Sequence, residues 1–167
     1  MIPVAGWFST GAKAGYRAAT SVSGRPMQLK YFVDSDGIIS FGESTYRRSK
    51  QLGRIIGVPP NHQAHHIIPW EHRTNAIVQQ AAKAKNNPFH MNQAENGIAI
   101  HKDFHAGDTP NAHPNYNNYM RQRLDQILSQ YGVEMSPQTA VSELNDLMAE
   151  IRQKILNNST THVDDLY

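Results

Sequence analysis

Two adjacent histidines, His65 and His66, are the residues of this sequence best placed to do chemistry. They precede Ile67 and Ile68, which favour an extended backbone, and Pro69, which closes the segment. Because neighbouring side chains of a strand point to opposite faces, the two imidazoles should diverge. One imidazole can then bind a metal ion while the other points towards a substrate. We interpret the pair as part of one metal-assisted hydrolytic site.

Further histidines follow at His101, His105 and His113, and all but one of the chain's nine histidines lie between residues 62 and 113. This clustering favours metal ligands over a chance enrichment in polar loops. Neutral imidazoles with few carboxylates favour Zn²⁺, Ni²⁺ or Mn²⁺ over Ca²⁺. Mg²⁺ stays open because a phosphate substrate would supply oxygen ligands. Since a catalytic site keeps an open position, two or three protein ligands to one divalent ion are enough.

Hydrolysis also needs a base for the attacking water. A histidine that does not bind the metal suits this task, because its unperturbed pKa lies near ~6.5. Its two ring nitrogens are inequivalent, so the ring must be oriented by another group. A backbone carbonyl or an Asn side chain can do this.

Composition and charge narrow the classes of partner. The absence of cysteine excludes disulfides and thiolate metal sites. No stretch is long enough to span a membrane, and residues 1–15 lack the order of a signal peptide. Residues 1–60 carry eight Lys/Arg and three Asp/Glu, a net charge of +5, whereas residues 61–167 carry eight and eleven, a net charge of −3. A basic front half beside a metal site suits a phosphate-rich partner.

The chain divides into three parts. Residues 1–25 are rich in Gly, Ala, Ser and Thr and are typical of a linker or lead-in from a longer parent chain. Residues 26–60 predict an N-terminal β-hairpin, turning at 34–37, and a basic helix over 44–56. Residues 61–160 predict the core and the C-terminal helices.

The basic helix carries four cations, Arg47, Arg48, Lys50 and Arg54. Such a run is either a solvated face or a set of phosphate contacts, and we assign these residues to nucleic-acid binding with the solvated face as the alternative.

Short strands and helices are expected along the rest of the chain. Ser136 should cap the last helix, with Pro137 at its first position. The two final helices should pack antiparallel, and their apolar stripes should belong to the core. The expected elements are a strand over 63–68, a helix over 76–85 capped by Thr74 or Asn75, a turn followed by a second short strand over 95–100, a helical or looped turn over 101–105, helices over 115–131 and from 137, and a frayed end over 157–167.

The order of these pieces resembles the AHH family of the HNH/endonuclease VII nucleases, found mostly as toxin domains at the C-termini of bacterial polymorphic toxins. The resemblance covers roughly residues 61–131. It rests on Ala64-His65-His66-Ile67-Ile68-Pro69, Glu95-Asn96-Gly97-Ile98, His105 and His113-Pro114-Asn115-Tyr116-Asn117.

This resemblance implies an α+β fold with a ββα-metal core of the HNH, or His-Me finger, type, with flanking helices and the N-terminal hairpin. It implies that His65, His105 and His113 bind the metal and that His66 is the general base. It gives Asn96 two tasks, which are to hold the loop between the strands and to orient that base.

The gap between His105 and His113 is longer than in colicin-type members, so His101 is the alternative third ligand. We assign the remaining histidines to the surface: His62, His72, His90 and His162.

The function implied by the resemblance is a metal-dependent endonuclease toxin that hydrolyses phosphodiester bonds in DNA. Its sequence specificity should be low, because backbone contacts carry no sequence information. One alternative is an RNase toxin of the same fold. Another is a non-catalytic module in which a closed site of four ligands supports nucleic-acid or partner binding. A third is an interaction domain whose histidines are there by chance.

We expect DNA as substrate and an acidic immunity protein that covers the basic front face or the metal cleft. We expect no membrane partner and no small-molecule cofactor. The chain would be made in a bacterial cytoplasm as part of a secreted antibacterial effector, and would act in the cytoplasm of the target cell.

Overall fold

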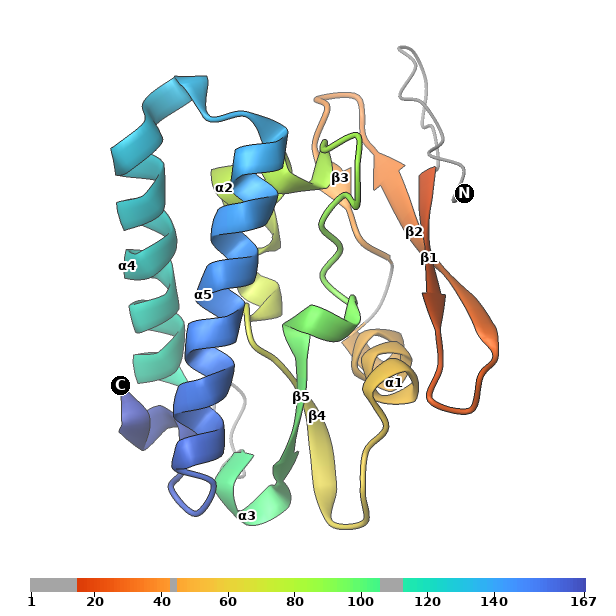
Figure 1. Ribbon diagram of the computed structural model, residues 1–167, viewed down its shortest axis with the longest axis vertical. Coiled ribbons are helices and arrows are strands. Elements are labelled where there is room, and N and C mark those ends of the chain that lie inside the picture. The colour runs from red at the N-terminus through yellow and green to blue at the C-terminus, as the bar shows by residue number, and fades with distance from the viewer. Residues whose placement is uncertain (1–14, 43–44, 106–112) are drawn as a thin grey trace.

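The computed structural model describes residues 15–42, 45–105 and 113–167 and is of mixed α+β class. A three-stranded sheet lies on one side of the molecule, and two long antiparallel helices lie on the other (Figure 1). A two-stranded ribbon and a short helix lie between them (Figure 1). None of the helices within the described ranges has both the length and the hydropathy that crossing a membrane requires.

The N-terminal sheet has the order β1-β2-β3, with β1 (Gly15–Thr20), β2 (Pro26–Val33) and β3 (Ile39–Ser40) all antiparallel to their neighbours. The predicted hairpin is confirmed, and Asp34 closes its turn by accepting two backbone N–H groups. The prediction of a linker over 1–25 is wrong for β1, and its first 14 residues lie outside the described chain. The small and polar residues of β1 show no clear alternation of apolar and polar side chains, so the sequence did not predict a strand. The strand forms because its backbone pairs with β2.

Helix α1 (Thr45–Ile56) is the basic helix predicted over 44–56, and Ser44, the first residue of that range, lies outside the described residues. It packs on the ribbon formed by β4 (His62–His66) and β5 (Gly97–His101). The approach is tight at Gly97, where an added Cβ would lie 2.6 Å from the Leu52 side chain. The glycine of the Asn-Gly pair is therefore needed to let α1 approach the ribbon.

Four further α-helices follow in the described part of the chain, as local sequence signals predict. Asn75 caps α2 (Ala76–Ala82), which ends three residues earlier than expected. The predicted turn after β5 is α3 (Lys102–His105). Helix α4 (Pro114–Tyr131) and helix α5 (Pro137–Asn157) run antiparallel (Figure 1). The predicted Ser136 cap is confirmed, since its hydroxyl accepts the Thr139 N–H.

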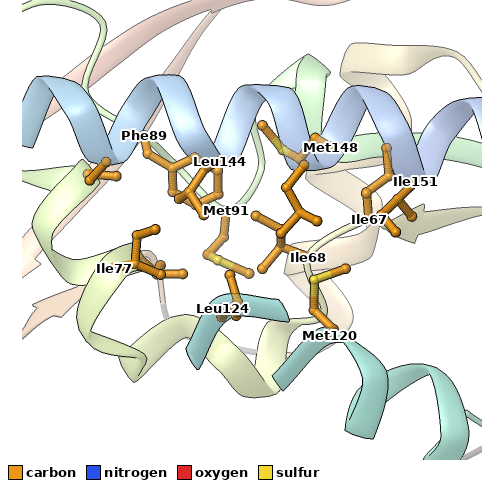
Figure 2. Packing of buried hydrophobic residues seen from close by; sticks show 14 of the residues in the cluster. Ile67, Ile68, Ile77, Phe89, Met91, Met120, Leu124, Leu144, Met148 and Ile151 are labelled. Atoms are coloured by element: carbon orange, nitrogen blue, oxygen red, sulfur yellow. The ribbon is translucent and has the colours of Figure 1, made fainter. Parts of the chain in front are cut away.

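The core begins directly after the histidine pair. Ile67 and Ile68 are fully buried and pack among side chains from α2, α4 and α5, as Figure 2 shows. The Tyr116 hydroxyl, from α4, donates to the carbonyl of Ile67. The end of β4 is therefore anchored to the core, which fixes the position of His65 and His66 at the last two residues of this strand.

The C-terminal end is packed, so the prediction that residues 157–167 fray is wrong. A short 3-10 helix, Val163–Leu166, buries Val163, and the Tyr167 ring lies 5.1 Å from the Tyr116 ring between centroids. The ammonium of Lys154 lies 3.8 Å from the centroid of Tyr167. Single anchors of this kind have no periodicity, so the sequence pattern could not reveal them.

Candidate metal centre

Three histidines from separate segments meet beside the ribbon. His65 comes from β4, His105 from the end of α3, and His113 directly precedes α4. One nitrogen from each ring lies within 4.8 Å of the other two. The ring centroids are 5.0 Å apart for His65 and His105, 5.4 Å for His65 and His113, and 5.2 Å for His105 and His113. We call these residues the histidine trio.

The trio leaves ring nitrogens without hydrogen bonds. His65 Nδ1 lies 3.0 Å from His105 Nε2. Within the described part of the chain, His65 Nε2 and His113 Nδ1 are buried and have no hydrogen-bond partner. Because a buried unsatisfied nitrogen costs stability, such atoms need an explanation. A metal ion between the rings would supply it, so the residues fit a divalent cation.

The electrostatic environment keeps the trio neutral. Burial lowers the pKa of His65 well below its ordinary value, and the nearby His105 and His113 lower it further. Burial and then His113 lower the pKa of His105 to about 4, and burial lowers the pKa of His113. Neutral imidazole is the form that binds metal, so no proton has to leave the trio at neutral pH.

A glutamine orients one ring of the trio. Gln63 Oε1 lies 2.5 Å from His105 Nδ1. Since the amide oxygen accepts, Nδ1 carries the proton and Nε2 presents its lone pair to the trio. Outer hydrogen bonds of this kind fix the tautomer of metal-binding histidines. Gln63 is not among the residues predicted from the sequence, although it lies two residues before His65 and therefore on the same face of β4.

His66 points away from the trio, so the prediction that the two imidazoles diverge is confirmed. Its Nε2 lies 2.8 Å from Asn92 Oδ1, and its ring centroid lies 5.7 Å from that of Trp70.

Asn96 holds the loop before β5, as the resemblance implied. Its Oδ1 accepts the Ile68 N–H at 2.6 Å, and its Nδ2 donates to the Met91 carbonyl at 2.8 Å. The contact to His66 comes instead from Asn92, so the expectation that Asn96 orients this ring needs correction. Asn92 was missed because only the folded loop brings it beside β4.

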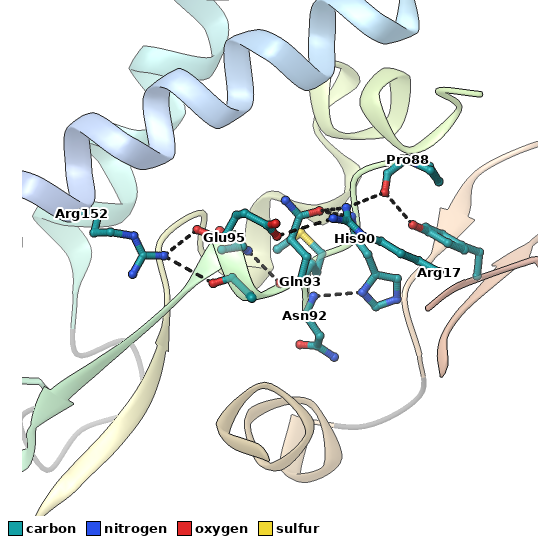
Figure 3. A network of polar contacts seen from close by, with 11 residues as sticks. Arg17, Pro88, His90, Asn92, Gln93, Glu95 and Arg152 are labelled. Carbon is teal, nitrogen blue, oxygen red and sulfur yellow. Dashed lines mark hydrogen bonds and ion pairs between the residues drawn. The ribbon is translucent and has the colours of Figure 1, made fainter. Parts of the chain in front are cut away.

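The loop that carries Asn92 is clamped from the N-terminal sheet (Figure 3). Arg17 of β1 donates to the Pro88 carbonyl at 3.0 Å and to Gln93 Oε1 at 2.6 Å. His90 Nε2 lies 3.1 Å from the carbonyl of Lys30 in β2. Two strands therefore fix this loop.

Helix α5 holds the other end of the same loop. Arg152 donates to the carbonyls of Glu95 and Gly97, each at 2.9 Å (Figure 3). The loop is thus bound on both sides of Asn92.

The other histidines do not join the trio. His101 Nδ1 lies 3.4 Å from Asp103 Oδ2, and its ring lies 5.2 Å from that of His62 across the ribbon, so the geometry favours His113 over His101 as third ligand. The surface assignment is wrong for His72 and His90, which are buried.

The remaining two histidines are half-buried. His62 lies on the ribbon opposite His101, and the ring of His162 lies 5.8 Å from that of His113. Neither belongs to the group of three converging nitrogens.

An open cleft of about 720 Å³ reaches His105 of the trio. Lys50 and Arg54 of α1 line it together with Gln63 and His105. The side chains of Arg47 and Arg48 lie outside the described residues. Two of the four cations assigned to nucleic-acid binding therefore line a cleft that reaches the trio.

The sequence model of the AHH family, a nuclease family of the HNH/ENDO VII superfamily with conserved AHH, matches residues 46–155. The match covers more than half of the chain. The chain belongs to the AHH nuclease family. No curated protein and no solved structure shows a match. In this AHH chain the matched region contains the trio, His66 and Asn92, whereas the three-stranded sheet precedes it.

Proposed function

We propose that the chain is a metal-dependent endonuclease that hydrolyses phosphodiester bonds in DNA with low sequence specificity. The observation that carries this proposal is the convergence of three neutral imidazoles inside a chain of a nuclease family. The ribbon β4–β5 with α3 and the start of α4 would form the ββα-metal core.

His65, His105 and His113 would hold one divalent ion. When bound, the ion supplies Lewis-acid stabilisation of negative charge on the phosphoryl group and the leaving oxygen. The donor set of three imidazoles fits Zn²⁺, Ni²⁺ or Mn²⁺ better than Mg²⁺, which prefers oxygen ligands. Three protein ligands would leave room for substrate, unlike a closed structural site of four.

His66 would be the general base. Its Nε2 donates to Asn92 Oδ1, so the neutral ring carries its lone pair on Nδ1. That nitrogen can take a proton from the attacking water.

Lys50 and Arg54 would contact substrate phosphates in the cleft beside His105. Arg47 and Arg48 belong to the same helix and would extend this contact. Such contacts carry no sequence information, which supports low specificity.

A toxin role would require restraint in the producing cell. We propose an acidic immunity protein that covers the basic front face or the metal cleft, with association steered by charge. Production in a bacterial cytoplasm, delivery as part of a larger toxin and action in the cytoplasm of the target cell complete the proposal.

The test is cleavage of supercoiled plasmid and total RNA, side by side, by the purified chain. We expect plasmid cleavage that EDTA abolishes and that added Mn²⁺, Zn²⁺, Ni²⁺ or Mg²⁺ restores to different degrees. His66→Ala should abolish cleavage while metal binding persists. Cleavage of RNA alone would replace DNA by RNA as substrate, and full plasmid cleavage by His66→Ala would overturn the base assignment.

A further inference from the structure

Two buried or half-buried amides lie in series behind His66. Asn92 is 1% exposed, and its Oδ1 lies 2.8 Å from His66 Nε2. Its Nδ2 donates to Gln51 Oε1 at 2.7 Å. A carboxamide has one donor end and one acceptor end, so with its Nδ2 bonded to Gln51 the Asn92 side chain presents its oxygen to the imidazole.

We propose that Asn92, held by Gln51, is the positioning residue that fixes the orientation and tautomer of His66. The inference rests on the proposed function, in which His66 is the base. With the oxygen of Asn92 towards His66, the ring proton stays on Nε2 and the lone pair stays on Nδ1. The reverse tautomer would place a proton on the nitrogen that has to accept one.

The backbone on both sides of this amide pair is held by its surroundings. The backbone N–H of Asn92 donates to His90 Nδ1 at 3.0 Å (Figure 3), and the opposite nitrogen of His90 lies 3.1 Å from the carbonyl of Lys30 in β2. Gln51 belongs to α1, whose approach to the ribbon depends on Gly97. Both amides therefore come from backbone that is held in place, which keeps the Asn92 side chain within reach of His66 and Gln51.

The same helix lines the cleft. Lys50 directly precedes Gln51 and, with Arg54, borders the cleft next to His105. Phosphate contact and orientation of the base would therefore depend on one helix. Neither amide belongs to the trio, so their loss should affect the rate and leave metal binding intact.

The experiment compares acceptor-keeping and acceptor-removing variants of the full chain. The variants are Asn92→Asp, Asn92→Ala, Gln51→Glu and Gln51→Met, with His66→Ala as reference. Plasmid cleavage gives kcat and KM, calorimetry gives Zn²⁺ affinity, and thermal unfolding reports the fold. Nitrogen NMR of the metal-free protein identifies which nitrogen of His66 carries the proton.

Asn92→Ala should lower kcat by about 10- to 100-fold, a fraction of what general-base catalysis supplies, with KM and Zn²⁺ affinity within about 2-fold. Asn92→Asp keeps the acceptor and should restore kcat to within about 3-fold. Gln51→Met should lower kcat by about 3- to 10-fold and Gln51→Glu should not. The proton should stay on Nε2 in Asn92→Asp and distribute over both nitrogens in Asn92→Ala.

Three results would overturn the inference: an unchanged kcat in Asn92→Ala, an equal loss of kcat in folded Asn92→Asp, or a loss of kcat matched by a loss of Zn²⁺ affinity. If Asn92→Ala does not fold, the Gln51 pair and the NMR assignment decide. Full activity of His66→Ala would instead overturn the base assignment on which the inference rests, and absence of any cleavage by the wild type would overturn the proposed function, so these failures can be told apart.

Discussion

Two buried histidine environments of this protein differ in how their ring nitrogens are satisfied. His90 is fully buried and its pKa is lowered to about 3 by burial, yet both nitrogens are bonded, one to the N–H of Asn92 and one to the carbonyl of Lys30. His65 is equally enclosed, but its Nδ1 faces another imidazole and its Nε2 lacks a partner among the described residues. Burial and a lowered pKa therefore do not identify a metal ligand. What distinguishes His65 is an unsatisfied ring nitrogen within a group of three converging imidazoles.

The largest effect on metal binding is expected in the trio, at His105, which lies beside His65. His105→Ala should lower Zn²⁺ affinity by more than about 100-fold and abolish plasmid cleavage, while the melting temperature of the metal-free protein changes by only a few degrees. Calorimetry and thermal unfolding check this. A variant that still binds Zn²⁺ as wild type does would remove His105 from the centre.

His90→Ala should show the opposite pattern. Loss of two hydrogen bonds and of ring contacts with Tyr31 and Phe41 should cost about 3 kcal/mol of unfolding free energy. Zn²⁺ affinity should stay at the wild-type value. Urea titration measures the first quantity, and a large drop in Zn²⁺ affinity would contradict the structural role.

Low pH should lower the free energy of unfolding because His90 takes up a proton more readily in the unfolded chain than in the folded protein. The pKa of His90 is about 3 in the folded protein and near its ordinary 6.5 when unfolded, so below pH 6.5 only the unfolded chain takes up this proton. Stability from this group is therefore complete above pH 6.5 and falls towards pH 3, by at most about 1.4 kcal/mol per pH unit. Urea titrations at several pH values should show a shallower slope in His90→Phe. An unchanged slope would assign the effect to other groups.

Gln63→Ala should weaken the metal centre without dismantling it. Loss of the hydrogen bond to His105 Nδ1 frees the ring to rotate, and Zn²⁺ affinity should fall by about 10-fold. Gln63→Glu keeps the acceptor and is the matched control. Equal affinities for both variants would show that Gln63 does not orient the ring.

The smallest effect is expected at the alternative ligand. His101→Ala should leave Zn²⁺ affinity within about 2-fold of wild type, because this ring lies with His62 and Asp103 outside the trio. A larger drop would return His101 to the list of ligands.

Local signals predicted most of the secondary structure. Several features depend only on residues that are close together in the sequence, so they could be predicted without knowledge of the tertiary structure. They are the turn at Asp34, the caps at Asn75 and Ser136, and the apolar face of α4. Strand β1 was missed because its order comes from pairing with β2.

The residues of the candidate site that the family resemblance implied could be predicted from the sequence. The contacts that form only when distant segments fold together could not. The convergence of His65, His105 and His113 follows the likeness. Asn92 and Gln51 lie 41 residues apart and meet only because α1 and the loop before β5 are brought together. No spacing in the sequence encodes that contact.

The three-stranded sheet lies before the region shared with the family, yet it supplies Lys30 and Arg17 to the loop that carries Asn92. Transplanting residues 46–155 alone into another protein would move every imidazole of the trio and leave this support behind. On the proposed function, such a graft should keep metal binding and lose the alignment of His66. The residues needed for full activity would then extend beyond the region that matches the family.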